Sequence, residues 1–220
     1  ARTLIQHGYL DNAGSSRRLV VGKRLVQIGC EIDHRLALRQ RALPYLGQLA
    51  QATGESAHMA VHASGKALVI EDVEVASSLR VVGGVGRQVA MHCTAVGKAL
   101  LAFCSLPIPD ELTRMMPATI TDSQELARHL NEIRRQGYAF DDEEHEPGVR
   151  CMAAPVTLSD STIAVIGISG PAARITDLRI VPIAQLLIET AGHLSQELQN
   201  SFQPPRKNGV PVAARLSAKA

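Results

Sequence analysis

The chain has 220 residues and a net charge of +2, and 45% of its residues are hydrophobic, so it can bury a sizeable core. Only 3% are aromatic, which leaves aliphatic side chains to fill that core. No apolar run approaches the roughly 20 residues that span a bilayer, and the four scattered cysteines form no CxxC pair. These features exclude a membrane-spanning protein and a disulfide framework, and they predict a cytoplasmic protein with free thiols.

The charges are unevenly distributed along the chain. Residues 1–41 contain eight Lys/Arg and three Asp/Glu, residues 42–202 contain eleven and eighteen, and residues 203–220 contain four basic residues and no acid. Basic ends around an acidic centre indicate a nucleic-acid contact at one end and a different task in the centre. Simple solvation of the basic ends is the alternative that charge alone leaves open.

Residues 1–21 predict a helix end, a hairpin and the approach to a second helix. Gly8 ends the first helix, and residues 11–16 (DNAGSS) have turn chemistry before the returning strand RRLVVG. This order is typical of the end of a winged helix-turn-helix, with Arg17 and Arg18 on the wing, where they could reach DNA phosphates. The preceding helices are missing, so we expect the chain to begin inside that domain; a generic hairpin is the alternative.

Helical spacing of apolar residues predicts two consecutive helices after the hairpin. The first runs from Gly22 to about Leu38, and the second carries apolar residues over 42–50 and ends at Gly54.

Residues 55–75 alternate in polarity and predict a β-hairpin with a turn at Ser64 and Gly65. His58 and His62 share one face of its first strand. We expect this face to be exposed to solvent, in preference to a metal site.

The next segment predicts a helix start that could bind an anion. A glycine-rich loop and a short strand over 81–91 lead to Thr94, a good N-cap residue for a helix beginning near Ala95. The amides of Ala95, Val96 and Gly97 would be unpaired donors at the positive end of the helix dipole. Helix capping alone also explains Thr94. The spacing GxxxxGK[ST] is absent, so we do not expect a nucleoside triphosphate site.

Residues 107–136 predict a helix (109–116), a loop and a second helix that Ser123 caps and Gly137 ends. Beyond them, continuous apolar character over 149–158 and 162–170 predicts two strands of a central sheet covered on both faces.

An amphipathic helix over 174–199 follows. The tail 203–220 has few bulky apolar residues, so we expect it to be disordered.

Residues 137–156 (GYAFDDEEHEPGVRCMAAPV) crowd five carboxylates before an apolar strand. They could form a solvated loop, a metal or catalytic cluster, or the rim of a small-molecule pocket. A thiolate–imidazole pair of Cys151 and His145 lacks an orienting third group, so we do not expect an enzyme. A metal site on His92, Cys93, His145 or Cys151 lacks a compact ligand motif, so we expect no metal and no cofactor.

Three blocks in this order and spacing, MHCTAVGKALLA, GYAFDDEEHEPGVRCMAAPV and GISGPAARI, resemble the effector-binding domain of the IclR family of bacterial transcription regulators. The segment LIQHGYL…RRLVVGKRLVQIG is similar to that family's wing and linker helix. The resemblance implies an α+β, GAF/PAS-like sensor domain with a central antiparallel sheet flanked by helices over 41–202. It also implies a partial winged helix over 1–21, a linker helix over 22–40, and dimers that often pair into tetramers.

The resemblance further implies an effector pocket. We expect it to be lined by a helix start, an acid, two small positions on the last strand and an apolar wall: Val81, Val89, Thr94, Ala95, Val96, Gly97, Asp141, Cys151, Gly167 and Ser169. Gly167 replaces a serine of some members, which would remove a hydroxyl donor and enlarge the pocket.

The remaining acids of the 137–156 block are expected outside this pocket. Burying unpaired carboxylates is costly, so Asp142, Glu143 and Glu146 should lie in water or pair with Arg150 and Arg135.

Together these expectations describe a ligand-responsive repressor of a catabolic operon, which senses a small organic acid or aromatic metabolite and binds double-stranded DNA through its N-terminal domain. Effector binding would order residues 83–86 and the acidic loop and so move the linker helix. The alternative is a stand-alone small-molecule or metal sensor that acts through protein contacts.

Overall fold

The computed structural model describes residues 1–13, 18–76, 81 and 83–202, with the backbone alone for 31–34 and 202. At the N-terminus, helix α1 (Arg2–Gln6) precedes an antiparallel hairpin of β1 (Leu10–Asn12) and β2 (Leu19–Val21), which confirms the predicted hairpin. Arg18 lies at its turn with an exposed side chain, whereas Arg17 and the tail 203–220 lie outside the described residues.

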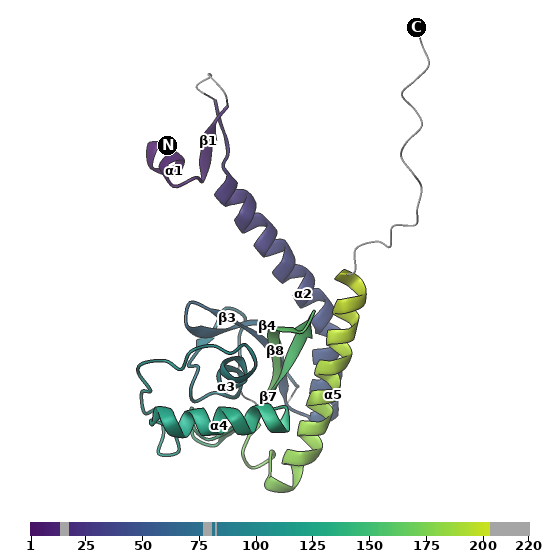
Figure 1. Cartoon of the computed structure of the whole chain (residues 1–220). Coiled ribbons are helices and arrows are strands. Elements are labelled where there is room, and N and C mark those ends of the chain that lie inside the picture. Colours follow the sequence, from purple (N-terminus) through teal and green to yellow (C-terminus); the bar gives the residue numbers. More distant parts are fainter. Residues whose placement is uncertain (14–17, 77–80, 82, 203–220) are drawn as a thin grey trace, which may run out of the picture.

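One continuous helix, α2 (Lys23–Thr53), replaces the two helices expected from the sequence. It therefore continues past residue 40, the predicted end of the linker. Leu38, Ala42 and Leu46 are buried at four-residue spacing and form an unbroken stripe against the core. Burial of this stripe outweighs the single backbone hydrogen bond that Pro44 removes inside the helix. The N-terminal half of α2 projects away from the sheet (Figure 1).

A six-stranded antiparallel sheet forms the centre of the molecule, in the order β5-β4-β3-β8-β7-β6. Its turns at Ser64–Gly65 and Ser159–Asp160 confirm the predicted connections. The strands are β3 (Ser56–Ala63), β4 (Lys66–Val73), β5 (Gln88–Val89), β6 (Ala139–Asp142), β7 (Val149–Leu158) and β8 (Ser161–Pro171).

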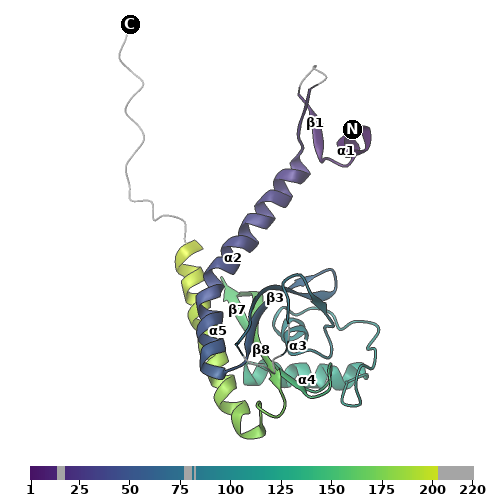
Figure 2. The ribbon, with the colours of Figure 1, turned by 180° about the vertical axis from the view of Figure 1, so that it is seen from behind.

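Helices cover both faces of this sheet, as the apolar strands predicted (Figures 1 and 2). The C-terminal half of α2 and α5 (Asp177–Phe202) pack on one face. Helix α3 (Ala95–Phe103) packs on the other face, and α4 (Ser123–Gln136) packs against α3. The fold is the expected α+β sandwich of helices around an antiparallel sheet.

Two local expectations between α3 and α4 are wrong. Residues 109–116 form no helix, because the Thr119 hydroxyl accepts hydrogen bonds from the backbone N–H groups of Met115 and Met116, at 3.1 and 2.7 Å. The N-cap of α4 is Asp122, whose carboxylate accepts the Glu125 N–H at 2.7 Å. Ser123 is instead the first helical residue.

The buried stripe of α2 gives a direct stability prediction. Leu46 is 0% exposed, and Leu43 on the same helix is 48% exposed. We expect Leu46→Ala to lower the free energy of unfolding by about 2–5 kcal/mol, because it leaves a cavity, and Leu43→Ala to lower it by less than about 1 kcal/mol. Urea denaturation followed by circular dichroism measures both; equal losses would contradict the continuous stripe.

Candidate functional site

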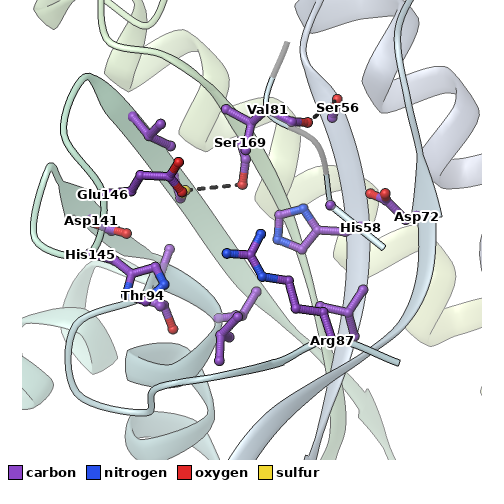
Figure 3. Close-up of a pocket in the computed structure, with 17 residues that line it drawn as sticks. Ser56, His58, Asp72, Val81, Arg87, Thr94, Asp141, His145, Glu146 and Ser169 are labelled. Atoms are coloured by element: carbon purple, nitrogen blue, oxygen red, sulfur yellow. Dashed lines mark hydrogen bonds between the residues drawn. The ribbon is translucent and has the colours of Figure 1, made fainter. Parts of the chain in front are cut away.

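A cavity of about 70 Å³ lies between the sheet and the N-terminus of α3 (Figure 3). Eight of the ten residues predicted for the pocket line it, and Gly97 and Gly167 do not. The lining residues come from all six strands of the sheet, the start of α3 and the loops beside them: Ser56, His58, Val69, Asp72, Val81, Gly83, Arg87, Val89, Thr94, Ala95, Val96, Asp141, His145, Glu146, Val149, Cys151 and Ser169.

A row of polar residues crosses four strands on one wall of the cavity. Asp141 pairs with Cys151, Cys151 with Ser169, and Ser169 with Ser56, so their side chains stand side by side. The Ser169 hydroxyl donates to the Cys151 sulfur at 3.1 Å, and the Ser56 hydroxyl donates to the Val81 carbonyl at 3.3 Å. The sheet register thus brings together residues that are more than 100 positions apart.

The start of α3 forms the floor, as predicted. The Thr94 hydroxyl accepts the Gly97 N–H at 3.1 Å and donates to the Ala90 carbonyl at 2.6 Å. The cap therefore uses the Gly97 amide, and Ala95 and Val96 are the helix-start residues that face the cavity. Their position at the positive end of the helix dipole favours a negative ligand group.

The two predicted glycines have packing roles instead. A Cβ at Gly97 would lie 2.4 Å from the Ala90 carbonyl oxygen, so glycine lets α3 approach the preceding segment. A Cβ at Gly167 would lie 2.6 Å from the Met152 carbonyl oxygen and 3.0 Å from Nε2 of His58. The expectation that Gly167 enlarges the pocket is therefore wrong, because the His58 imidazole fills that space.

His58 was expected on a solvent face, and this is corrected as well. It is buried and lines the cavity, because β3 lies inside the sheet with β4 and β8 on either side and α3 covers this face. Burial, and then the charge of Arg87, lowers the pKa of His58 to about 4, so the ring is neutral at pH 7. His62, near the strand end, is exposed as expected.

Asp141 occupies the position expected of the pocket acid. It is 2% exposed, and one of its carboxylate oxygens accepts the Glu144 backbone N–H at 2.8 Å. Burial raises its pKa to about 7, and the hydrogen bond from Glu144 opposes this rise. Near neutral pH this carboxyl can thus accept a hydrogen bond or, when protonated, donate one.

A buried ion pair that the sequence analysis missed holds the acidic loop. Lys98 on α3 is fully buried and pairs with Glu144, and its ammonium also donates to the Phe140 carbonyl at 2.6 Å. The ammonium lies 3.3 Å from Nε2 of His129, whose pKa burial and Lys98 lower to about 4. The only sequence signal was a single lysine inside an otherwise apolar helix.

The other acids of the 137–156 block lie nearer to water. Asp142 pairs with Arg150 at 2.6 Å, as expected, and the Glu143 carboxylate accepts the Gly148 N–H at 2.7 Å. Glu146 is exposed at the rim of the cavity. The expectation for Arg135 is wrong, because it pairs with Glu132 one turn earlier on its own helix.

The cysteines near the cavity are poor nucleophiles. His145 Nδ1 lies 3.6 Å from the sulfur of Cys93, and no hydrogen bond joins it to Cys151 in the described residues. Burial raises the pKa of Cys93 to about 12 and raises that of Cys151, so both thiols keep their protons. Among the described residues, no three His, Cys, Asp or Glu side chains gather in a way that could hold a metal ion.

Comparison with known proteins identifies the family. The family described as "Bacterial transcriptional regulator IclR C-terminal" matches residues 30–196. The chain belongs to the IclR family. It is therefore a transcription regulator and not an enzyme. In the described part of the chain, no helix combines the length and apolar character needed to cross a membrane.

Several relatives of this IclR-family chain are known. The HTH-type transcriptional regulator BhcR of Paracoccus denitrificans is 33% identical over 203 residues, which cover 88% of this chain and 72% of that protein. The transcriptional repressor IclR of Escherichia coli is 30% identical over 201 residues, or 86% and 72% of the two chains. The crystal structure of Thermotoga maritima IclR superposes with a TM-score of 0.69 at 30% identity, covering 90% and 83%. It confirms the fold.

The close approach at Gly97 predicts a large effect of one methyl group. We expect Gly97→Ala to lower the free energy of unfolding by about 1–3 kcal/mol, because the new Cβ would meet backbone atoms. The control is Gly47→Ala in α2, where a Cβ meets nothing within 4 Å and should stabilise by about 0.5–1 kcal/mol. Urea denaturation of both variants decides; an unaffected Gly97→Ala would contradict the packing role.

The raised pKa of Asp141 predicts a pH dependence of stability. The folded state holds a proton on Asp141 up to about pH 7, whereas the unfolded chain releases it near pH 4. The folded state therefore binds more protons between these values, and stability should fall by on the order of a few kcal/mol as pH rises through this window.

Unfolding free energies of the wild type and Asp141→Asn, measured from pH 4 to 8, isolate this contribution as the difference in slope. Asp142→Asn, next to it in sequence but half exposed and paired with Arg150, should keep the wild-type slope. An unchanged slope in Asp141→Asn would rule out the perturbed carboxyl.

Proposed function

We propose that this chain carries the effector-binding part of a ligand-responsive repressor of a catabolic operon, and that the cavity beside α3 binds a small organic acid. The strongest support for this proposal is that the start of α3 and the polar row of Asp141, Cys151 and Ser169 line the same cavity. A crystal structure of an IclR homolog from Microbacterium hydrocarbonoxydans contains 4-hydroxybenzoate; it shares the fold, with a TM-score of 0.68 at 24% identity.

The polar groups suit a carboxylate at one end of the cavity. The helix-start amides of Ala95 and Val96 would bind its oxygens with the favourable helix dipole behind them. In Figure 3 the Arg87 guanidinium lies between His58 on one side and Thr94 and His145 on the other, where it adds positive charge to the cavity. Asp141 and Ser169 would orient a further polar group of the ligand.

The connection to α2 offers a route for the response. The helix ends at Thr53, three residues before Ser56 in the cavity wall. Between them, the buried Glu55 forms two hydrogen bonds with Arg174, at 2.8 and 2.6 Å, and thereby joins the end of α2 to the segment after β8. A ligand that binds two arrangements of this joint with different affinity would shift their populations and move the projecting part of α2.

The N-terminal arm supports the DNA-binding and oligomeric parts of the proposal. Arg18, which precedes β2 in the hairpin, and its sequence neighbour Arg17 would contact operator phosphates as a wing does. The arm also exposes large apolar side chains that a second copy would cover in a dimer or tetramer: Leu19, Val20, Val21, Leu25, Val26 and Ile28.

Ligand binding tests the proposal. In a thermal-shift screen of aliphatic acids, aromatic acids and divalent metals, we expect saturable stabilisation by one carboxylate. Asp141→Ala and Ser169→Ala should each weaken its binding by about tenfold or more, which corresponds to roughly 1.4 kcal/mol. Ser161→Ala is the control, because Ser161 is exposed at the opposite end of β8 from Ser169. Stabilisation by metals alone, insensitive to these substitutions, would favour a metal sensor.

A further inference from the structure

His58 occupies a distinctive place in the wall of the cavity. It pairs in register with Gly167 on β8 and with Asp72 on β4, so its imidazole stands on the face of the sheet that α3 covers. Nε2 lies 3.0 Å from where a Cβ of residue 167 would be. The imidazole therefore packs directly beside Gly167, where the Cβ of a larger residue would crowd it.

The residues in line with His58 are all smaller. Along this row, Ala139 on β6 pairs with Ala153 on β7, and Ala153 pairs with Gly167 on β8. All three are buried, and the absence of large side chains lets α3 lie close to β6, β7 and β8. Of these four residues, only His58 has a large side chain, and His58 is also the one that lines the cavity.

The cavity that remains is small. Its volume of about 70 Å³ is less than half of the roughly 150 Å³ of an engineered protein cavity that binds benzene. An aromatic ring would need the His58 side chain to move, and the neighbouring strands β4 and β8 flank it on both sides.

We propose that His58, seated on Gly167, sets the size limit of the cavity and makes this chain select compact aliphatic carboxylates over aromatic ones. This inference rests on the proposed binding of an organic acid in the same cavity. His58 acts as a specificity residue and not as the anion site, which lies at the α3 start on the opposite side. Its ring, neutral because its pKa is lowered to about 4, can still give one hydrogen bond to a compact ligand.

Calorimetric titration of the chain with a graded set of acids tests the limit. The probes are acetate, pyruvate, butyrate, benzoate and 4-hydroxybenzoate. The wild type should bind at least one aliphatic acid about tenfold or more tighter than either aromatic acid. His58→Ala should bind benzoate about tenfold or more tighter than the wild type does. His62→Ala, on the same strand but outside this cavity, should keep the wild-type order of affinities.

Each other result overturns the inference in a different way. Equal binding of benzoate and aliphatic acids by the wild type would contradict the proposed size limit but not the proposed carboxylate site. An unchanged preference in His58→Ala removes the role of His58. Absence of binding by every acid removes the carboxylate site itself and the inference with it.

A second variant protects the test against a folding defect. If circular dichroism shows that His58→Ala is unfolded, His58→Asn keeps a polar side chain of smaller volume and should widen the selectivity in the same direction. Failure of a folded His58→Asn to admit benzoate better than the wild type would overturn the role of His58.

Discussion

The close approach of α3 to the central sheet is the constraint on which the rest of the structure depends. Gly97 lets the start of α3 contact the backbone of residues 90–91. On the sheet, the small residues Ala139, Ala153 and Gly167 let α3 pack closely. Because the helix start is held this close, its amides, the polar row of the sheet and His58 face one small cavity. Larger residues at these positions would separate the floor from the wall.

The buried pair of Lys98 and Glu144 is the second element of this arrangement. Removing two charges from water is costly, and only good geometry with further hydrogen bonds offsets the cost. Lys98 meets this condition through the Phe140 carbonyl and His129, and the Thr119 hydroxyl donates to the Glu144 carbonyl at 2.6 Å. The Glu144 backbone N–H in turn fixes Asp141. The buried charges thus position the acidic loop, and through it the acid that faces the cavity.

Local features were predictable because neighbouring residues decide them. The Ser64–Gly65 and Ser159–Asp160 turns, the Thr94 cap and the ends of helices at Gly54 and Gly137 all depend on the conformational preferences of a few adjacent residues. The errors arose where a side-chain hydrogen bond or a tertiary contact outweighed the helical pattern of the sequence. The Thr119 hydroxyl replaced helical hydrogen bonds over 115–116, and the packing of Leu38 to Leu46 carried α2 across its expected break.

The sequence by itself determined the strands, most helices, the family and eight of the residues around the cavity. Only the tertiary structure decided that His58 faces this cavity, that Asp72 and Arg87 lie beside it, and that Lys98 and Glu144 pair across 46 positions. The physical reason is the register of the sheet. Alternation assigns a side chain to one of two faces, but which face is buried, and which residues stand opposite, depends on strands and helices far away in the chain.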